Sequence, residues 1–213
     1  MANLLTILRM ILAVIAIEFL FSGHPALAIS AVVLTLIVIV LDGLDGYVAR
    51  KLNEQSKFGS VFDILGDRVV ENLYWIAFAI LGLVAPWVPM VVVTRGIITD
   101  GLRGIALSHG YTAFGDSTMM QNKLCHFLTA SRFSRAVYGV AKTLVFLMLI
   151  IAYIPNFTYY DAMSVDSFVL YSQYQGYLIV IANILVYITV GMCVIRGIPV
   201  LFESKRFLTD DKK

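Results

Sequence analysis

Four aspartates lie close together in a chain that is otherwise mostly apolar. They are Asp42, Asp45, Asp63 and Asp67, and all fall within the stretch LDGLDGYVARKLNEQSKFGSVFDILGDRVVEN, residues 41–72. Carboxylate oxygens are hard ligands that suit Mg²⁺ or Mn²⁺. Four carboxylates in one place suit a pair of ions, which in enzymes commonly bridge phosphate groups. The residue types therefore predict a divalent-metal site that acts on a phosphorylated substrate.

The spacing of the aspartates predicts how they are arranged. Asp42 and Asp45 are three residues apart and share one face of a helix, and Asp63 and Asp67, four apart, share one face of the next helix. A polar link over 51–58 would fold the two helices into a hairpin. Equal distances from that turn set Asp45 beside Asp63 and Asp42 beside Asp67. The result is a square of carboxylates one or two turns below the inner membrane surface.

Such a square needs positive charge. An ionised side chain at the centre of a membrane helix costs about 2.5–3.5 kcal/mol on the insertion scale. Two like charges 4 Å apart repel by roughly 4 kcal/mol at an effective dielectric constant near 20. Arg50 and Arg68 are too few to neutralise four carboxylates, so bound metal ions are expected. The alternative is a set of protonated or water-solvated acids at a cytoplasmic helix end.

The composition indicates which elements hold these residues. The chain has 213 residues, is 60% hydrophobic and 14% charged, and has a mean hydropathy of +0.86. A soluble domain cannot bury that much apolar surface, so we expect an all-α, polytopic integral membrane protein with a single domain over residues 1–213. Arg9 and Glu18 interrupt the first apolar segment. Six segments are long enough to be transmembrane helices: 4–22, 26–50, 59–84, 86–108, 134–155 and 173–202.

The distribution of basic residues predicts the orientation in the membrane. All 16 Lys and Arg lie outside the stretches 23–26, 84–88 and 155–173. By the positive-inside rule these three stretches form the outer loops, and both termini and the aspartate hairpin face the cytoplasm. The inner stretch 108–133 is expected to contain a short helix. A net charge of +2 gives no reason to expect a nucleic-acid partner.

The aspartates belong to a longer pattern that resembles a known signature. The pattern is Asp-x-x-Asp-Gly-x-x-Ala-Arg, then eight residues, then Gly-x-x-x-Asp-x-x-x-Asp. It resembles the signature of the CDP-alcohol phosphotransferase (CDP-alcohol phosphatidyltransferase) family. The resemblance implies a six-helix membrane fold, a homodimer, and a reaction in which an alcohol displaces CMP from CDP-diacylglycerol. The matching positions are Asp42, Asp45, Gly46, Ala49, Arg50, Gly59, Asp63 and Asp67.

The resemblance also implies a role for each of these residues. Asp42, Asp45 and Asp63 would ligate Mg²⁺ or Mn²⁺, as two ions, and Asp67 would complete the site and act as general base. The membrane lipid CDP-diacylglycerol and a small alcohol would be the substrates. The residues bordering the CDP moiety would be Asp42, Asp45, Gly46, Ala49, Arg50 and Gly59.

Three further stretches are similar to the phosphatidylglycerolphosphate synthase branch of that family. They are NLLTILRMILA (3–13), TRGIITDGLRGIAL (94–107) and YGVAKTLVFLML (138–149). This similarity implies that Arg95, Arg103 and Lys142 bind the phosphate of the acceptor, which would be glycerol 3-phosphate. Alternatively, the two arginines pair with acidic residues inside the helix bundle.

The acceptor is left open between several alcohols. Gly96 stands where those synthases usually carry Glu, and Ile64 stands where Pro usually follows the third aspartate. Inositol phosphate, inositol and another alcohol are therefore alternatives to glycerol 3-phosphate.

Two other classes of membrane protein use clustered acids. An intramembrane prenyltransferase also places aspartates and Mg²⁺ on a diphosphate, but usually in two motifs on distant helices. A carboxylate-driven transporter would place its acids near the bilayer midplane on broken or repeated helices. All four aspartates here fall in one predicted hairpin, which favours the CDP-alcohol chemistry over both.

Overall fold

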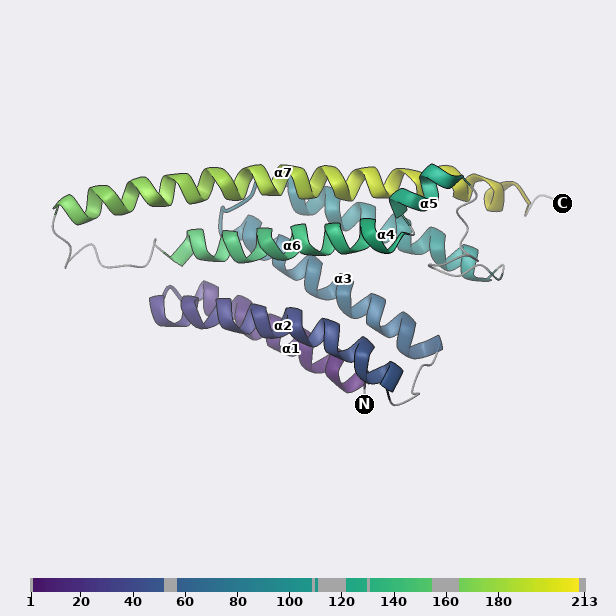
Figure 1. Cartoon of the computed structure of the whole chain (residues 1–213), viewed down its shortest axis with the longest axis horizontal. Helices are drawn as coiled ribbons and strands as arrows, with labels where there is room; N and C mark the ends of the chain where they lie inside the picture. Colours follow the sequence, from purple (N-terminus) through teal and green to yellow (C-terminus); the bar gives the residue numbers. More distant parts are fainter. Residues whose placement is uncertain are drawn as a thin grey trace. The chain divides into compact units, whose positions relative to one another are not determined.

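The protein is all-α in the part of the chain that the structure describes. The structure is a computed structural model, and it describes residues 2–51, 57–108, 110, 122–129, 131–154 and 165–210. Within these ranges every regular element is a helix, which confirms the predicted fold class (Figure 1). The helices are α1 (Ala2–Phe21), α2 (Pro25–Lys51), α3 (Lys57–Ile80), α4 (Trp87–Ser108), α5 (Lys123–Thr129), α6 (Arg132–Tyr153) and α7 (Val165–Asp210).

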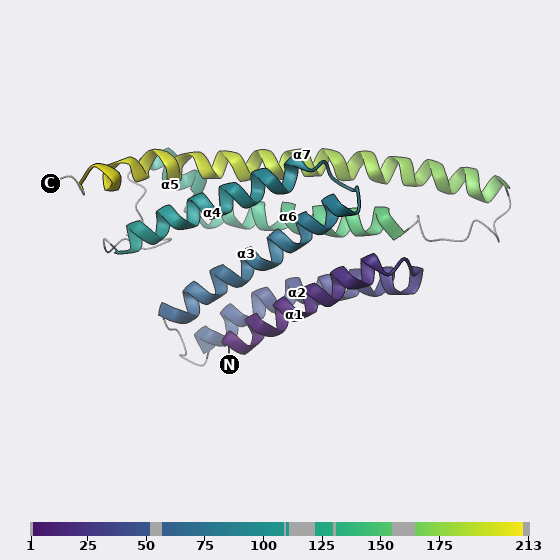
Figure 2. The ribbon, with the colours of Figure 1, turned by 180° about the vertical axis from the view of Figure 1, so that it is seen from behind.

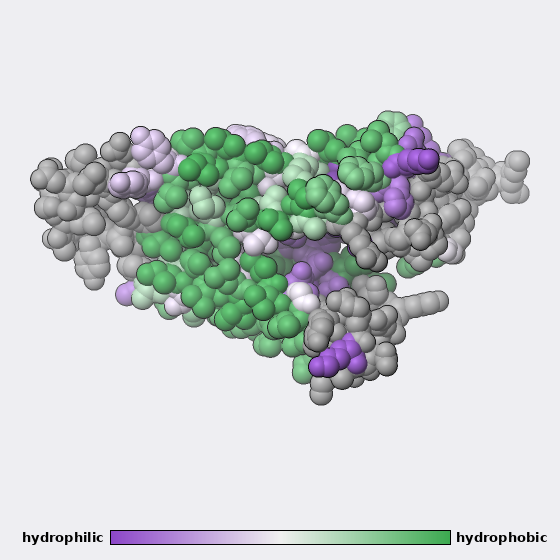
Figure 3. All heavy atoms as spheres, in the orientation of Figure 1, coloured by the Kyte–Doolittle hydropathy of each residue, from purple (hydrophilic) through white to green (hydrophobic). Residues whose placement is uncertain are grey.

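Among the described helices, four candidate stretches are long and apolar enough to cross a membrane, and one of them joins α5 and α6. They are Asn3–Phe21, Ala26–Leu44, Lys123–Tyr153 and Tyr174–Lys205. Helices α3 and α4 have 24 and 22 residues, and both contain several charged residues. Their crossing of the membrane, and so the total of six spans, remains a prediction. Apolar side chains cover much of the exposed flanks of the helices, as expected beside lipid (Figure 3).

The predicted segments match the helices closely except at α7. The stretch 155–173 was expected to be an outer loop, but α7 already begins at Val165, so that expectation is wrong from this residue on. No proline or glycine occurs between Val165 and Gly176, and nothing in the sequence therefore ends the helix on that side. The short helix expected within 108–133 is α5.

The chain forms two compact units. The first comprises Met1–Pro86 and Val145–Ile184, and it contains α1, α2 and α3 together with the aspartates. The second comprises Trp87–Leu144 and Leu185–Lys213, and it contains α4, α5 and the cations predicted to bind the acceptor. The single-domain organisation remains a prediction.

Helices α1 and α2 form an antiparallel hairpin, and α1 packs against both α2 and α3 (Figures 1 and 2). Gly23 forms the tight turn of the hairpin with a φ of 70°, a backbone conformation that favours glycine. Alanines are fully buried on both helices, Ala13 and Ala16 on α1 and Ala28 and Ala31 on α2. Such small side chains let membrane helices approach closely.

Helix α3 ends in a Schellman motif around Gly82. This glycine has a φ of 73°, and its N–H donates to the Ala79 carbonyl at 3.1 Å. The N–H of Leu83 donates to the Phe78 carbonyl at 2.8 Å, so two of the carbonyls near the end of the helix have partners. The motif sets the end of the helix that carries Asp63 and Asp67.

A buried hydrogen bond sets the register between α2 and α3. The hydroxyls of Thr35 and Tyr74 lie 2.7 Å apart. Thr35 precedes Asp42 by seven residues and Tyr74 follows Asp67 by seven, which is about 10.5 Å along each helix. Because the two helices run in opposite directions, this bond brings Asp42 to the level of Asp67.

Aromatic packing holds α3 in that position. The Phe146 ring of α6 lies 5.0 Å from the ring of Tyr74, 5.2 Å from that of Trp75 and 5.5 Å from that of Phe78, measured between centroids. All four residues are buried within the first compact unit. Large rings in stacked and edge-on contact pack densely and restrict sliding of the helices.

Candidate functional site

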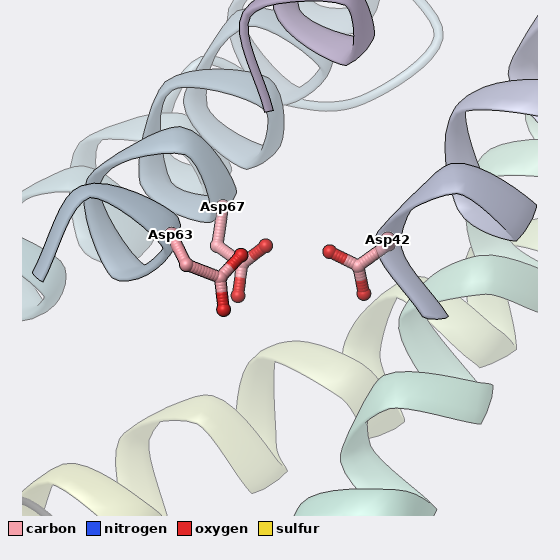
Figure 4. A group of neighbouring side chains, drawn as sticks. All are labelled: Asp42, Asp63 and Asp67. Carbon is pink, nitrogen blue, oxygen red and sulfur yellow. The ribbon is translucent and has the colours of Figure 1, made fainter. Parts of the chain in front are cut away.

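Three of the four aspartates converge in the structure. Asp42 on α2 points toward Asp63 and Asp67, which project from α3 (Figure 4). One carboxylate oxygen from each lies within 4.8 Å of the others. The three side chains are 51%, 45% and 45% exposed, so a ligand can reach them. Helical spacing explains the pair on α3, since residues four apart lie on the same face.

The remaining motif residues belong to the same two helices. Gly59 lies in α3, one turn before Asp63, and is partly buried. The surroundings of the other four motif residues lie outside what the structure describes, although their backbone belongs to α2. These residues are Asp45, Gly46, Ala49 and Arg50.

A cation that the sequence analysis overlooked lies among the three carboxylates. Arg9 of α1 is only 2% exposed, and its Nη1 pairs with Asp42 and, at 2.9 Å, with Asp67. Its Nη2 lies 3.4 Å from Asp63. The inventory of nearby cations, limited to Arg50 and Arg68, was therefore wrong. The position of Arg9 inside an apolar segment was the signal for this role, because a charge there usually has an ionic partner.

Gly66 makes room for Arg9 on α3. A Cβ atom at this position would lie 2.5 Å from Cγ2 of Thr6 and 3.1 Å from Nη2 of Arg9. Any side chain larger than hydrogen would therefore push α1 away from α3. The glycine lets α1 pack closely enough for its arginine to reach the carboxylates on both neighbouring helices.

A second ion pair continues along α3. Nη1 of Arg68 donates to Oε2 of Glu71 at 3.0 Å, and Glu71 is buried. Glu71 lies one turn beyond Asp67, so the acidic face of the helix extends into the core with its own cation.

The donor set of the cluster fits a divalent metal ion. Asp42, Asp63 and Asp67 offer only hard oxygen atoms, which are the ligands that Mg²⁺ and Mn²⁺ prefer. Mg²⁺ retains several waters when bound, and the partial exposure of the carboxylates allows this. The three residues could therefore hold an ion, in agreement with the prediction from their types.

The second compact unit contains a cluster of cations around Tyr138. Arg196 of α7 is 7% exposed, and its Nη1 donates to the Ser134 hydroxyl. Its guanidinium lies over the Tyr138 ring at 5.3 Å, and the ammonium of Lys142 approaches the same ring at 5.9 Å. Sequence reasoning predicted Lys142 and missed Arg196, although a lone arginine within an apolar helix was a signal for it.

The two predicted arginines of α4 differ in their surroundings. Arg95 lines a cavity of about 450 Å³ between α4 and α7, and a Cβ atom on Gly197 would lie 3.0 Å from its Cγ. Arg103 lies 3.7 Å from Asp100, which is the ionic pairing considered as an alternative role. Among the described residues, the buried Nε atoms of Arg95 and Arg196 have no hydrogen-bond partner. Cations with unsatisfied donors suit an anionic ligand.

Several curated proteins are similar to this chain. It is 30% identical to the CDP-diacylglycerol--glycerol-3-phosphate 3-phosphatidyltransferase of Cereibacter sphaeroides over 105 residues, 47% of this chain and 48% of the relative. It is 30% identical to the Bacillus subtilis protein of that name over 86 residues, 40% and 45% of the two chains. It is 27% identical to a probable phosphatidylglycerophosphate synthase of Mycobacterium tuberculosis over 113 residues, 52% and 54% of the two chains. The chain thus spans about half the length of the curated relatives it matches.

A family model covers far more of the chain than these pairwise matches. It is the model described as CDP-alcohol phosphatidyltransferase, and it matches residues 1–195. The matched region includes the three converging carboxylates, the arginine among them and the complete eight-position motif. The chain therefore belongs to the CDP-alcohol phosphatidyltransferase family.

Proposed function

We propose that this protein transfers the phosphatidyl group of CDP-diacylglycerol to glycerol 3-phosphate, which gives phosphatidylglycerol phosphate and releases CMP. Membership of the family and the names of the relatives support the reaction class. The observation that carries the proposal is the convergence of Asp42, Asp63 and Asp67 at carboxylate oxygens within 4.8 Å. The same chemistry with inositol phosphate, inositol or another alcohol is the second candidate.

The acidic residues would hold the metal and receive the proton. Asp42, Asp45, Asp63 and Asp67 would hold two divalent ions, Mg²⁺ or Mn²⁺, which when bound neutralise the diphosphate of the lipid substrate. Asp67 would also act as general base and accept the proton of the attacking hydroxyl. Phosphoryl transfer depends mainly on positioning and charge stabilisation. The register set by Thr35 and Tyr74 serves that positioning.

The proposed step exchanges one phosphorus–oxygen bond for another. The hydroxyl oxygen of the acceptor forms a bond to the phosphorus that carries diacylglycerol. The bond from that phosphorus to the bridging oxygen of the diphosphate breaks, and CMP leaves with the electron pair. The hydroxyl proton goes to the Asp67 carboxylate, so charge and atoms balance.

The cations of the second unit would bind the phosphate of the acceptor. The sequence predicts this role for Arg95, Arg103 and Lys142. We add Arg196, because it lies over the same Tyr138 ring as Lys142. Arg95 also lies near Arg196, since its Cγ is 3.0 Å from where a Cβ atom of the neighbouring Gly197 would be. Like charges in an apolar bundle are stabilised by an anion, and guanidinium groups match phosphate well.

The reaction is tested with purified protein, CDP-diacylglycerol and Mg²⁺ in the presence of a panel of acceptors. Release of CMP with glycerol 3-phosphate is expected to exceed that with inositol phosphate, inositol and glycerol. Loss of all CMP release on chelation of divalent ions is expected with every acceptor. Faster turnover of an uncharged alcohol would contradict the acceptor assignment and leave the reaction class intact.

Replacement of Arg196 by glutamine is expected to raise the KM for glycerol 3-phosphate by about ten-fold or more, since a hydrogen bond to a charged group contributes about 1.5–3 kcal/mol. The KM for CDP-diacylglycerol should change by less than about two-fold, because the change removes no contact to the nucleotide. Lys205→Gln is the matched control, since it removes the same charge from an exposed residue of the same helix. Equal changes in both KM values would place Arg196 outside the acceptor site.

We also propose that the aspartate cluster opens to the cytoplasm. Lys51 at the end of α2 and His24 in the turn before α2 are both exposed, and the positive-inside rule puts them on opposite sides. The test uses two variants, each with a single cysteine at position 24 or at position 51, in a protein that lacks Cys125 and Cys193. An impermeant thiol reagent added to intact cells is expected to label position 24 and to spare position 51. The reverse pattern would move the chemistry to the outer face.

A further inference from the structure

Arg9 takes the position at the carboxylates that a metal ion would need. Its two terminal nitrogens contact oxygen atoms of Asp42, Asp63 and Asp67, the same three residues whose oxygens form the candidate metal site. A divalent ion would bind those oxygens directly, at about 2.0–2.1 Å for Mg²⁺. The guanidinium and the ion therefore compete for the same three carboxylates.

The surroundings of Arg9 show that this contact is built into the fold. The side chain is 2% exposed and reaches the cluster from α1, across the surface that Gly66 leaves open. Its buried Nε has no hydrogen-bond partner among the described residues, so the carboxylates are its principal partners there. A guanidinium offers five donors in a rigid fork, which can contact several carboxylates at once.

The charges of the cluster also require such a contact. Three ionised carboxylates within 4.8 Å of one another repel strongly when no cation is present. One guanidinium carries a single positive charge and leaves the group of four side chains at a net charge of −2. Divalent ions neutralise the acids more completely, so they can displace the arginine.

We propose that Arg9 is a positioning residue that holds the three carboxylates together in the metal-free protein and competes with divalent ions for them. The inference rests on the metal site of the proposed function. It adds that a divalent ion, when it binds, replaces the Arg9 guanidinium at the carboxylates. Metal affinity is therefore lower than the carboxylates alone would give.

The first test measures Mn²⁺ binding to the purified full chain without any substrate, by the loss of the free-ion electron paramagnetic resonance signal. Arg9→Gln is expected to lower the Kd for Mn²⁺ by about ten-fold or more, which corresponds to about 1.4 kcal/mol. Arg9→Lys keeps the charge but loses the fork, so its Kd should fall between the two. Lys51→Gln removes the same charge from an exposed residue of α2, and its Kd should stay within about two-fold of the wild type.

The second test measures thermal unfolding with a chelator and with saturating Mn²⁺. Arg9→Gln should unfold at a lower temperature than the wild type in the chelator, because its carboxylates have lost their cation. The difference should disappear in Mn²⁺, because the ion then neutralises the acids in both proteins. If Arg9→Gln does not fold without metal, Arg9→Lys provides the same comparison.

Each outcome bears on the inference. An unchanged or higher Kd in Arg9→Gln overturns it, and so does a difference in unfolding temperature that persists in saturating Mn²⁺. If the wild type and Arg9→Gln bind Mn²⁺ with the same Kd, the metal site is supported and the proposed competition is wrong. If neither the wild type nor Arg9→Gln binds Mn²⁺, the metal site of the proposed function fails together with the inference.

Discussion

Replacement of Asp67 by asparagine is expected to lower the turnover number by about 10²–10⁴-fold, the usual contribution of a positioned general base. Asparagine has nearly the same shape, but its amide does not accept the proton of the acceptor hydroxyl. The KM for CDP-diacylglycerol should change much less, because Asp42, Asp45 and Asp63 remain to hold the metal. The measurement is CMP release at varied concentrations of the lipid substrate.

A parallel variant separates the base from the other carboxylates. Asp42→Asn should lower turnover and also raise the KM for CDP-diacylglycerol, because Asp42 is expected both to ligate metal and to border the nucleotide. Glu203→Gln is the control, since it removes a carboxylate from the other compact unit, and its kinetics should match the wild type. Near-normal turnover of Asp67→Asn would show that another group is the base.

Replacement of Gly66 by alanine is expected to destabilise the protein by about 1–3 kcal/mol, the usual cost of overpacking a tight interface. The new Cβ would lie 2.5 Å from Cγ2 of Thr6, so α1 has to move away from α3. Arg9 moves with α1 and loses its contacts to the carboxylates, so Mn²⁺ should bind more tightly than in the wild type, as expected for Arg9→Gln. Thermal unfolding in detergent and Mn²⁺ binding are the two measurements.

The control for this variant is a glycine in open space. Gly101 of α4 is exposed, and a Cβ atom there would have nothing within 4 Å. Gly101→Ala should therefore leave stability unchanged or raise it by up to about 1 kcal/mol, because alanine favours the helix. The same helical preference acts at Gly66, where the clash should outweigh it. A Gly66→Ala protein as stable as the wild type would mean that α1 does not pack on this residue.

The helices could be predicted mainly from the lengths of the apolar segments. Five of the six predicted segments correspond to α1, α2, α3, α4 and α6 with small shifts at their ends. The sixth begins earlier than predicted, at Val165, because a helix continues until something in the sequence ends it. The aromatic and polar residues of 155–173 favour a loop, but neither residue type ends a helix.

The convergence of the aspartates followed from helical periodicity and one turn. Asp63 and Asp67 share a face because they are four residues apart, and Asp42 reaches their level because α2 and α3 are consecutive and antiparallel. Both facts are local, so the sequence alone indicates them. Counting residues from the predicted turn gives the register of the two helices only approximately. The hydrogen bond between Thr35 and Tyr74 then sets it.

The partners of Asp42, Asp63 and Asp67 were decided by the tertiary structure. The sequence by itself determined the helices, the shared faces and the motif that identifies the family. It could not show that α1 packs against both α2 and α3 and brings Arg9 to the carboxylates, or that Arg196 of α7 stacks on Tyr138 of α6. In a membrane the hydrophobic effect does not select neighbouring helices, because lipid is as apolar as the side chains. Close approach at small residues such as Gly66, together with buried ionic contacts, makes that choice, and both depend on three-dimensional packing.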